Sequence, residues 1–147
     1  MELGAAGSIT SQWNVFANYT YTQAKTLNSS AYPDREGQRL GNTPRSSFSL
    51  WTTYKPDDSW TLGYGARFMG TRNVTAQGDG ELASYLVHSA MVSYDLDKHF
   101  RLQLNVDNLG DKAYVERVRQ VLGSESRSSA IEYGDGRVAM LTATYKF

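Results

Sequence analysis

The feature that most constrains this chain is a two-residue alternation of apolar and polar side chains, repeated in short segments. In Phe100–Asp107, the clearest case, four apolar residues alternate with Arg, Gln, Asn and Asp. Successive side chains of a β-strand point to opposite faces, so this period indicates strands with one apolar and one polar face. The alternation predicts seven strands, at Glu2–Thr10, Trp13–Thr22, Ser47–Tyr54, Trp60–Met69, Tyr85–Leu96, Phe100–Asp107 and Val138–Phe147.

The connections between these segments alternate between short and long. The short ones are Thr10–Gln12, Lys55–Asp58 and Asp97–His99, and the long polar ones are Ala24–Pro44, Gly70–Ser84 and roughly Gln120–Gly136. Outer-membrane barrels have short periplasmic turns and longer extracellular loops. A soluble meander has no reason to collect its long loops at one end.

Aromatic side chains gather beside the short turns, and by parity they all lie on the apolar face. They are Trp13, Tyr54, Trp60, Tyr94, Phe100, Tyr145 and Phe147. Rings at one height on a lipid-facing surface form an aromatic girdle. We therefore predict an all-β, antiparallel, up-and-down transmembrane β-barrel segment. The alternative is the half-buried sheet of a soluble protein, such as a lipocalin-like binder.

Composition is compatible with a membrane barrel and excludes several other classes. Mean hydropathy is −0.50, and no window is apolar enough for a spanning helix, but a barrel strand presents only alternate residues to lipid. The net charge of zero gives no indication of a nucleic-acid partner. Cysteine is absent, which excludes disulfides and thiolate metal sites.

An odd number of strands is unusual for an up-and-down barrel. The first and last segments would run in the same direction, so closing them on each other would create a parallel seam. We therefore expect residues 1–147 to form an arc of a wider barrel, with an open edge at Glu2–Thr10 that needs further strands. No signal peptide is visible at Met1–Gly4, so we expect either that one was removed or that the chain is a piece of something longer.

Four segments resemble a known family in their order and spacing. They are Asn42–Tyr54, Leu62–Arg72, Leu102–Tyr114 and Thr144–Phe147. Together they resemble the C-terminal end of TonB-dependent outer-membrane receptors, especially the ferric-siderophore branch. Two departures are Gly110, where the family usually has Phe, and Ala83-Ser84-Tyr85, where Pro-Gly-Tyr is common.

The resemblance implies a barrel of about 22 strands with a plugged lumen, of which residues 1–147 would be the C-terminal part, without the plug domain. It implies one long strand from Phe100 to about Val118 with a bulge near Asn108–Asp111. The implied function is TonB-dependent uptake of a ferric siderophore, an iron chelate that is transported ligand rather than cofactor. The implied partners are outer-membrane lipid, the missing plug and strands, TonB through the plug, and the barrel-assembly machinery. An alternative is a small stand-alone or oligomeric outer-membrane barrel with a structural or adhesive role.

Several cationic or aromatic residues are candidates for contact with an anionic ligand. Arg67 and Arg101 point to the lumen by parity, where each contacts a ligand or the plug, or else pairs with a neighbour such as Asp107 or Asp95. The candidates in or near external loops are Tyr32, Arg35, Arg39, Arg45, Trp51 and Arg72, for which solvated loop charge is the alternative.

The two histidines do not suggest catalysis or metal binding. His88 falls on the apolar face and His99 in a short turn, and no spaced second ligand accompanies either. We therefore expect no enzyme. Tyr145 and Phe147 have the family's form of a C-terminal assembly signal, with membership of the aromatic girdle as the alternative that can hold at the same time.

Overall fold

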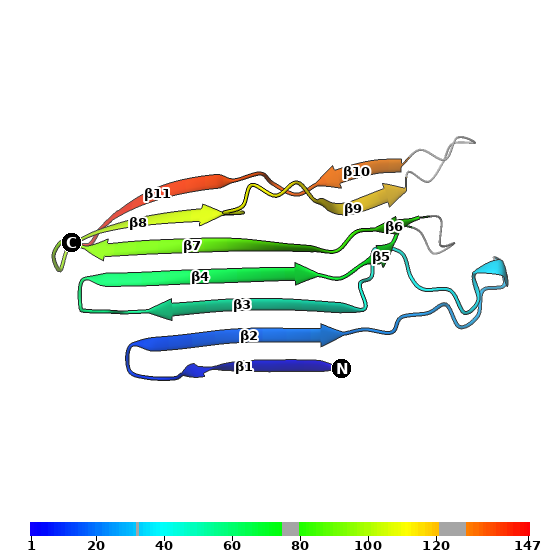
Figure 1. The fold of residues 1–147 in the computed structure, drawn as a ribbon, viewed down its shortest axis with the longest axis horizontal. Coiled ribbons are helices and arrows are strands. Elements are labelled where there is room, and N and C mark those ends of the chain that lie inside the picture. Colours follow the sequence, from blue (N-terminus) through cyan, green and yellow to red (C-terminus); the bar gives the residue numbers. More distant parts are fainter. Residues whose placement is uncertain (32, 75–79, 121–128) are drawn as a thin grey trace.

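The computed structural model describes residues 1–31, 33–74, 80–120 and 129–147. Seven strands form one antiparallel sheet in the order β1-β2-β3-β4-β7-β8-β11 (Figure 1). Their bounds are β1 Glu2–Ser8, β2 Trp13–Tyr21, β3 Ser46–Tyr54, β4 Trp60–Met69, β7 Tyr85–Asp95, β8 Phe100–Asp107 and β11 Val138–Tyr145. The seven predicted strands are confirmed, and their ends differ from the prediction by two residues at most.

The register of the sheet sorts side chains onto the two predicted faces. One row of paired residues runs across the sheet as Trp13, Tyr54, Leu62, Val92, Leu104 and Leu141. The adjacent row is Asn14, Thr53, Gly63, Met91, Asn105 and Met140. Because paired residues lie on the same face, the first row belongs to an apolar face and the second to a polar face.

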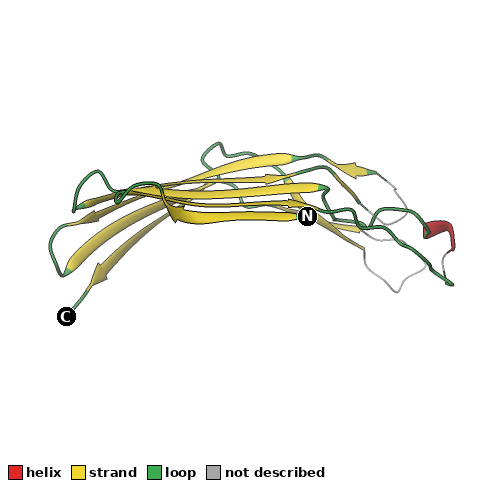
Figure 2. Ribbon diagram, turned by 90° about the horizontal axis from the view of Figure 1, so that it is seen from below, coloured by secondary structure: helices red, strands yellow, loops and turns green. Residues whose placement is uncertain are grey.

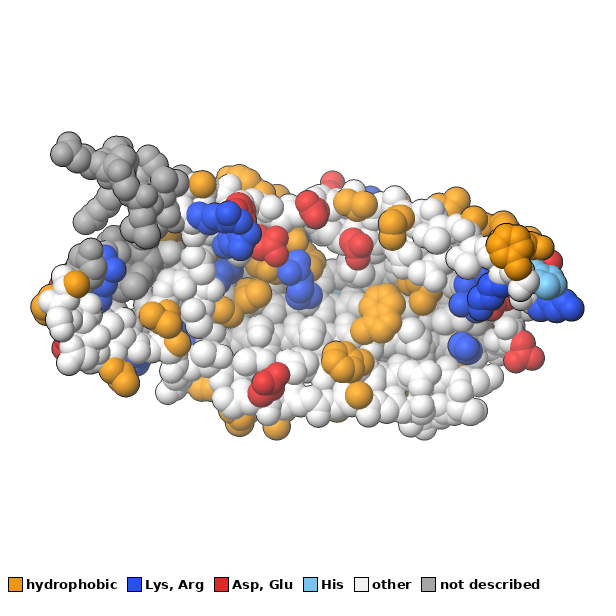
Figure 3. Space-filling model, turned by 180° about the vertical axis from the view of Figure 1, so that it is seen from behind, with side chains coloured by type: hydrophobic (Ala, Val, Ile, Leu, Met, Phe, Trp, Pro, Cys, Tyr) orange, Lys and Arg blue, Asp and Glu red, His pale blue; other side chains and the backbone are white. Residues whose placement is uncertain are grey.

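The sheet is a single curved layer with almost no core (Figure 2). Among the described residues, the buried hydrophobic side chains are Tyr85, Val87 and Val118. Large side chains of the apolar face are exposed instead, as Leu141 is at 70%. Figure 3 shows the polar face, on which hydrophobic side chains form scattered spots between polar groups. A soluble domain would cover so large an apolar surface, so this sheet requires an apolar environment on one side.

All three short turns lie at one end of the sheet and use the same local device. An oxygen of Thr10, Asp57 or Asp97 accepts the backbone N–H groups of the residues two and three positions later. Such side-chain-to-backbone bonds are the reason why Asp and Thr favour turns. The predicted segregation of short and long connections is confirmed.

The long connections contain structure that the sequence pattern did not predict. They hold the 3-10 helix η1 (Pro33–Arg35), the paired strands β5 (Arg72–Asn73) and β6 (Glu81–Leu82), and strand β10 (Ser129–Tyr133). Strand β10 pairs with β9 (Val115–Gln120), which falls largely within the strand expected to reach Val118. The prediction of a loop from Gln120 to Gly136 was therefore wrong for β10, and its residues 121–128 lie outside the described part of the chain.

The expected single strand from Phe100 to Val118 is also interrupted by more than a bulge. Residues 108–114 separate β8 from β9, and Asn108 and Asp111 have φ of 48° and 50°. The Asn108 side chain accepts the Lys112 N–H and donates to the carbonyls of Lys112 and Asp135, at 2.9 Å each. These bonds take the place of strand-to-strand hydrogen bonds. They join the segment between β8 and β9 to the segment between β10 and β11.

Candidate functional site

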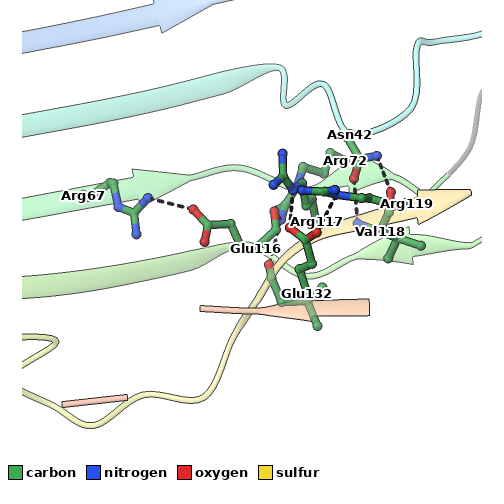
Figure 4. A network of polar contacts seen from close by, with 9 residues as sticks. Asn42, Arg67, Arg72, Glu116, Arg117, Val118, Arg119 and Glu132 are labelled. Carbon is green, nitrogen blue, oxygen red and sulfur yellow. Dashed lines mark hydrogen bonds and ion pairs between the residues drawn. The ribbon is translucent and has the colours of Figure 1, made fainter. Parts of the chain in front are cut away.

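A cluster of charged and aromatic side chains lies where β4, β7 and β9 meet the long connections. It consists of Arg67 on β4, Arg72 on β5, Tyr85 at the start of β7, Tyr114 just before β9, and Glu116 on β9. Figure 4 shows Arg67 and the Glu116 side chain directed toward one another. We call these five residues the arginine–tyrosine cluster.

Arg67 is fixed at several atoms and still half exposed. Its Nη2 donates to the Tyr114 hydroxyl at 2.9 Å, and its Nη1 lies 3.5 Å from a Glu116 carboxylate oxygen. The guanidinium carbon lies 5.6 Å from the ring centroid of Tyr85 and 5.9 Å from that of Tyr114, within the range of cation–π attraction. Arg67 is therefore pre-oriented on the polar face, with part of its guanidinium still accessible.

Arg72, in contrast, is only 1% exposed. Its Nη2 donates to the backbone carbonyls of Val115 and Glu116 at 2.7 and 2.5 Å, and its guanidinium carbon lies 5.6 Å from the Tyr85 ring centroid. Burial lowers the pKa of Arg72, although arginine keeps its charge in proteins. The sequence placed Arg72 among exposed loop charges, but the structure uses it to hold β9 against β5 and β7.

Tyr85 is 2% exposed, and its ring lies tilted by 35° against that of Tyr114, with 4.2 Å between ring centroids. Its hydroxyl and the Nη1 of Arg72 are both buried and have no hydrogen-bond partner among the described residues. Sequence reasoning found only Arg67 and Arg72 of this cluster, because Tyr85, Tyr114 and Glu116 belong to separate segments and follow no common spacing.

A hollow of about 450 Å³ lies on the polar face beside the cluster. It is lined by Ser49, Leu50, Trp51, Gly65, Ala66, Arg67, Val87, Ser89, Asp107, Asn108, Tyr114, Asp135 and Gly136. The sequence placed Trp51 in or near an external loop, and that placement was wrong. Trp51 lies inside β3, flat against Gly63 and Gly65, where an added Cβ would come within 2.9 Å of its ring. It covers the two glycines and supplies one wall of the hollow.

The other candidate arginines lie apart from this cluster. Arg101 pairs with Asp95 at 2.5 and 2.8 Å beside the short turns, as the alternative of pairing with a neighbour predicted. Arg67 also pairs with a carboxylate, but with that of Glu116 rather than that of Asp107. Arg35 ends η1, far from the short turns (Figure 1).

Arg39 forms an isolated bridge with Lys25 and lines, with Arg45, a small hollow of about 100 Å³ in the β2–β3 connection. Tyr32 lies outside the described residues.

At the end with the short turns, Tyr145 and Lys146 contact His99 in the β7–β8 turn. The Lys146 N–H donates to the His99 carbonyl at 2.8 Å, and the His99 ring contacts the Lys146 carbonyl at 3.0 Å. Tyr145 and Phe147 meet edge to face with 5.2 Å between ring centroids. These bonds hold the end of the chain to the β7–β8 turn, past the last paired residues of β11 and β8.

His88 lies on the apolar face, as predicted, and the Tyr64 hydroxyl lies 2.6 Å from its Nδ1, so each satisfies the other. Within the described ranges, no group of three metal-ligating side chains occurs. The same ranges hold no helix with the length and hydropathy needed to cross a membrane.

A single antiparallel layer with one exposed apolar face, one polar face and its short turns at one end is the wall of a β-barrel. Residues 1–109 match the family model described as TonB dependent receptor-like, beta-barrel. The chain belongs to this family, and the predicted resemblance is confirmed.

Named relatives and solved structures agree with this assignment. The chain is 37% identical to the protein named probable TonB-dependent receptor BfrD of Bordetella pertussis, over 97% of the chain and 19% of that protein. It resembles the crystal structure of the siderophore receptor PiuA of Acinetobacter baumannii, with a TM-score of 0.81 and 31% identity over 99% of the chain and 21% of that structure. It also resembles the ferric-catecholate import receptor Fiu of Escherichia coli, with a TM-score of 0.80 and 30% identity over 99% of the chain and 20% of that structure. The chain spans about a fifth of the length of these relatives.

Proposed function

We propose that residues 1–147 form part of the wall of an outer-membrane barrel that takes up a ferric siderophore with energy delivered through TonB. The observation that carries this proposal is the sheet itself, whose exposed apolar face suits lipid and whose polar face carries an oriented Arg67. Family membership and the names of relatives, which include a catecholate siderophore receptor and a ferrichrome outer membrane transporter, support it.

In this proposal the short turns face the periplasm and the long connections face the outside. Further strands pair with the edge of β1, and a plug domain that contacts TonB fills the space over the polar face. Tyr145 and Phe147 then lie at the periplasmic rim, where the barrel-assembly machinery reads them as the assembly signal.

Arg67 is the proposed ligand contact within the lumen. Its guanidinium is accessible at the edge of the hollow, and this planar group binds carboxylate and catecholate oxygens in bidentate geometry. Arg35 and Arg39, in the connection between β2 and β3, are proposed to meet the chelate first. Trp51 contributes a wall of the hollow, and Arg72 acts on the ligand through the position of β9.

The test is Arg67→Gln in the complete receptor, with uptake of radioiron bound to ferrichrome or to a catecholate siderophore. Loss of one charge-assisted hydrogen bond should weaken apparent affinity about tenfold or more while the amount of receptor at the surface stays constant. Arg101→Gln is the matched control, because Arg101 is held by Asp95 beside the short turns and should leave affinity unchanged. Unchanged affinity in Arg67→Gln contradicts the role of Arg67, and unchanged uptake in cells that lack the receptor contradicts the proposed function.

A further inference from the structure

Asn42 lies in the connection between β2 and β3 and contacts both of the other long connections. Its backbone N–H donates to the carbonyl of Asn73 on β5 at 2.8 Å. Its side-chain Nδ2 donates to the Val118 carbonyl on β9 at 2.8 Å, and its Oδ1 accepts the Val118 N–H at 3.1 Å (Figure 4). One residue thus joins three segments that are far apart in the sequence.

These contacts substitute for a strand along one edge of β9. The other edge of β9 pairs with β10, so the backbone groups facing β5 need partners from elsewhere. The Asn42 amide supplies both a donor and an acceptor to Val118, as a neighbouring backbone would, and Arg72 supplies donors to the carbonyls of Val115 and Glu116. Val118 is only 5% exposed, whereas Asn42 itself is exposed and the two bonds between them are part-buried. The Asn42 amide therefore covers the Val118 backbone from the outside, and its loss would open that backbone to water.

The residue at position 42 is also restricted by its backbone. Asn42 has a φ of 53°, in the left-handed region that Gly, Asn and Asp adopt most readily. A residue at this position must therefore tolerate that conformation and also present an amide to β9. Of these three residue types, only Asn supplies both hydrogen bonds.

We propose that Asn42 is a positioning residue that couples the three long connections, so that the β2–β3 connection, β5 and the paired strands β9 and β10 move as one unit. This coupling extends to Arg67, the proposed ligand contact, so its consequence for uptake rests on the proposed function. Asn42 holds Val118 on β9, the same strand carries Glu116, and Glu116 together with Tyr114 holds Arg67. Contact with a ligand at Arg35 or Arg39 in the β2–β3 connection is thereby transmitted to Arg67 in the lumen.

The chain has no cysteine, so one introduced thiol can report on this contact. Val118→Cys in the complete receptor is treated on intact cells with a membrane-impermeant maleimide, with and without Asn42→Gly. Glycine keeps the left-handed backbone but removes both side-chain bonds to Val118. We expect slow labelling when Asn42 is present. In the Asn42→Gly background, labelling should be about tenfold faster or more, because two hydrogen bonds no longer hold β9 against the β2–β3 connection.

Two matched controls accompany the experiment. Ile131→Cys, at a position that is 53% exposed on β10, should label at the same rate in both backgrounds. Asn28→Gly, an exposed asparagine in the same connection as Asn42, should leave Val118→Cys protected.

Equal labelling of Val118→Cys with and without Asn42→Gly would overturn the proposal, as would labelling in the presence of Asn42 as fast as that of Ile131→Cys. If Asn42→Gly lowers the amount of assembled receptor, Asn42→Asp makes the same comparison, since it keeps the acceptor for the Val118 N–H but sets a carboxylate against the Val118 carbonyl. The labelling needs no ligand, so its outcome is independent of the proposed uptake. In the uptake assay, Asn42→Gly should weaken apparent affinity without lowering the maximal rate, a split that general loss of folded receptor would not give.

Discussion

The ring of Tyr114 lies directly against the backbone of Gly134, and this close approach allows a sharp prediction. A Cβ built on Gly134 would overlap the Tyr114 ring at Cζ, Cε2 and the hydroxyl oxygen. Among the described residues, the glycines with positive φ are Gly37 and Gly80, so Gly134 is required for space rather than for backbone freedom. Gly134→Ala must therefore displace the Tyr114 ring.

The cost of that displacement follows from the contacts of Tyr114. Its hydroxyl accepts a hydrogen bond from Arg67, worth about 1.5–3 kcal/mol for a charged donor. Its ring contacts that of Tyr85, and an aromatic pair of this kind is worth about 0.5–1.5 kcal/mol. Alanine also lowers the conformational entropy of the unfolded chain, which offsets about 0.4–1 kcal/mol of this loss in stability. Gly134→Ala should therefore lower the free energy of unfolding by about 1–4 kcal/mol.

The measurement is urea unfolding of the complete barrel in detergent, followed by tryptophan fluorescence, for Gly134→Ala, Tyr114→Ala and the double variant. Without the ring, alanine at 134 meets no obstacle, so Gly134→Ala should cost almost nothing in the Tyr114→Ala background. A cost that is the same in both backgrounds, or a neutral single variant, would refute the steric argument.

Two further predictions concern the end with the short turns. The Asp97 carboxylate accepts the N–H groups of His99 and Phe100, which lowers its pKa, so its contribution to stability is complete above the ordinary carboxyl pKa and is lost as pH falls through the lowered value. Asp97→Asn keeps an acceptor oxygen and should flatten this part of the acid dependence of the urea midpoint; an unchanged acid dependence would contradict the assignment. Deleting Phe147 should impair assembly, measured by heat-modifiable migration and surface exposure, whereas Phe147→Tyr should assemble normally. Normal assembly of the deletion would exclude the terminal ring as a required signal.

The sequence anticipated the wall of the sheet in detail because strand geometry imposes its own period. Alternation in Phe100–Asp107 or Trp60–Met69 locates both the strand and its two faces, and a one-residue shift of register would invert every side chain. The short turns were equally readable, since Asp57 and Asp97 satisfy backbone groups only two and three residues away. The same pattern failed in the long connections, where β5, β6 and β10 are short and carry no repeat of useful length.

The sequence by itself determined the seven strands, their faces and the family, because these depend on local periodicity and on ordered motifs. Only the tertiary structure decided which side chains form the candidate site. Asn42 and Val118 are 76 positions apart, and Arg67 and Tyr114 are 47 apart. The position of β9 above the sheet decides how exposed each arginine is. Arg72 is buried beneath it, whereas Arg67 remains half exposed. That position is set by hydrogen bonds between distant loops, which no spacing along the chain encodes.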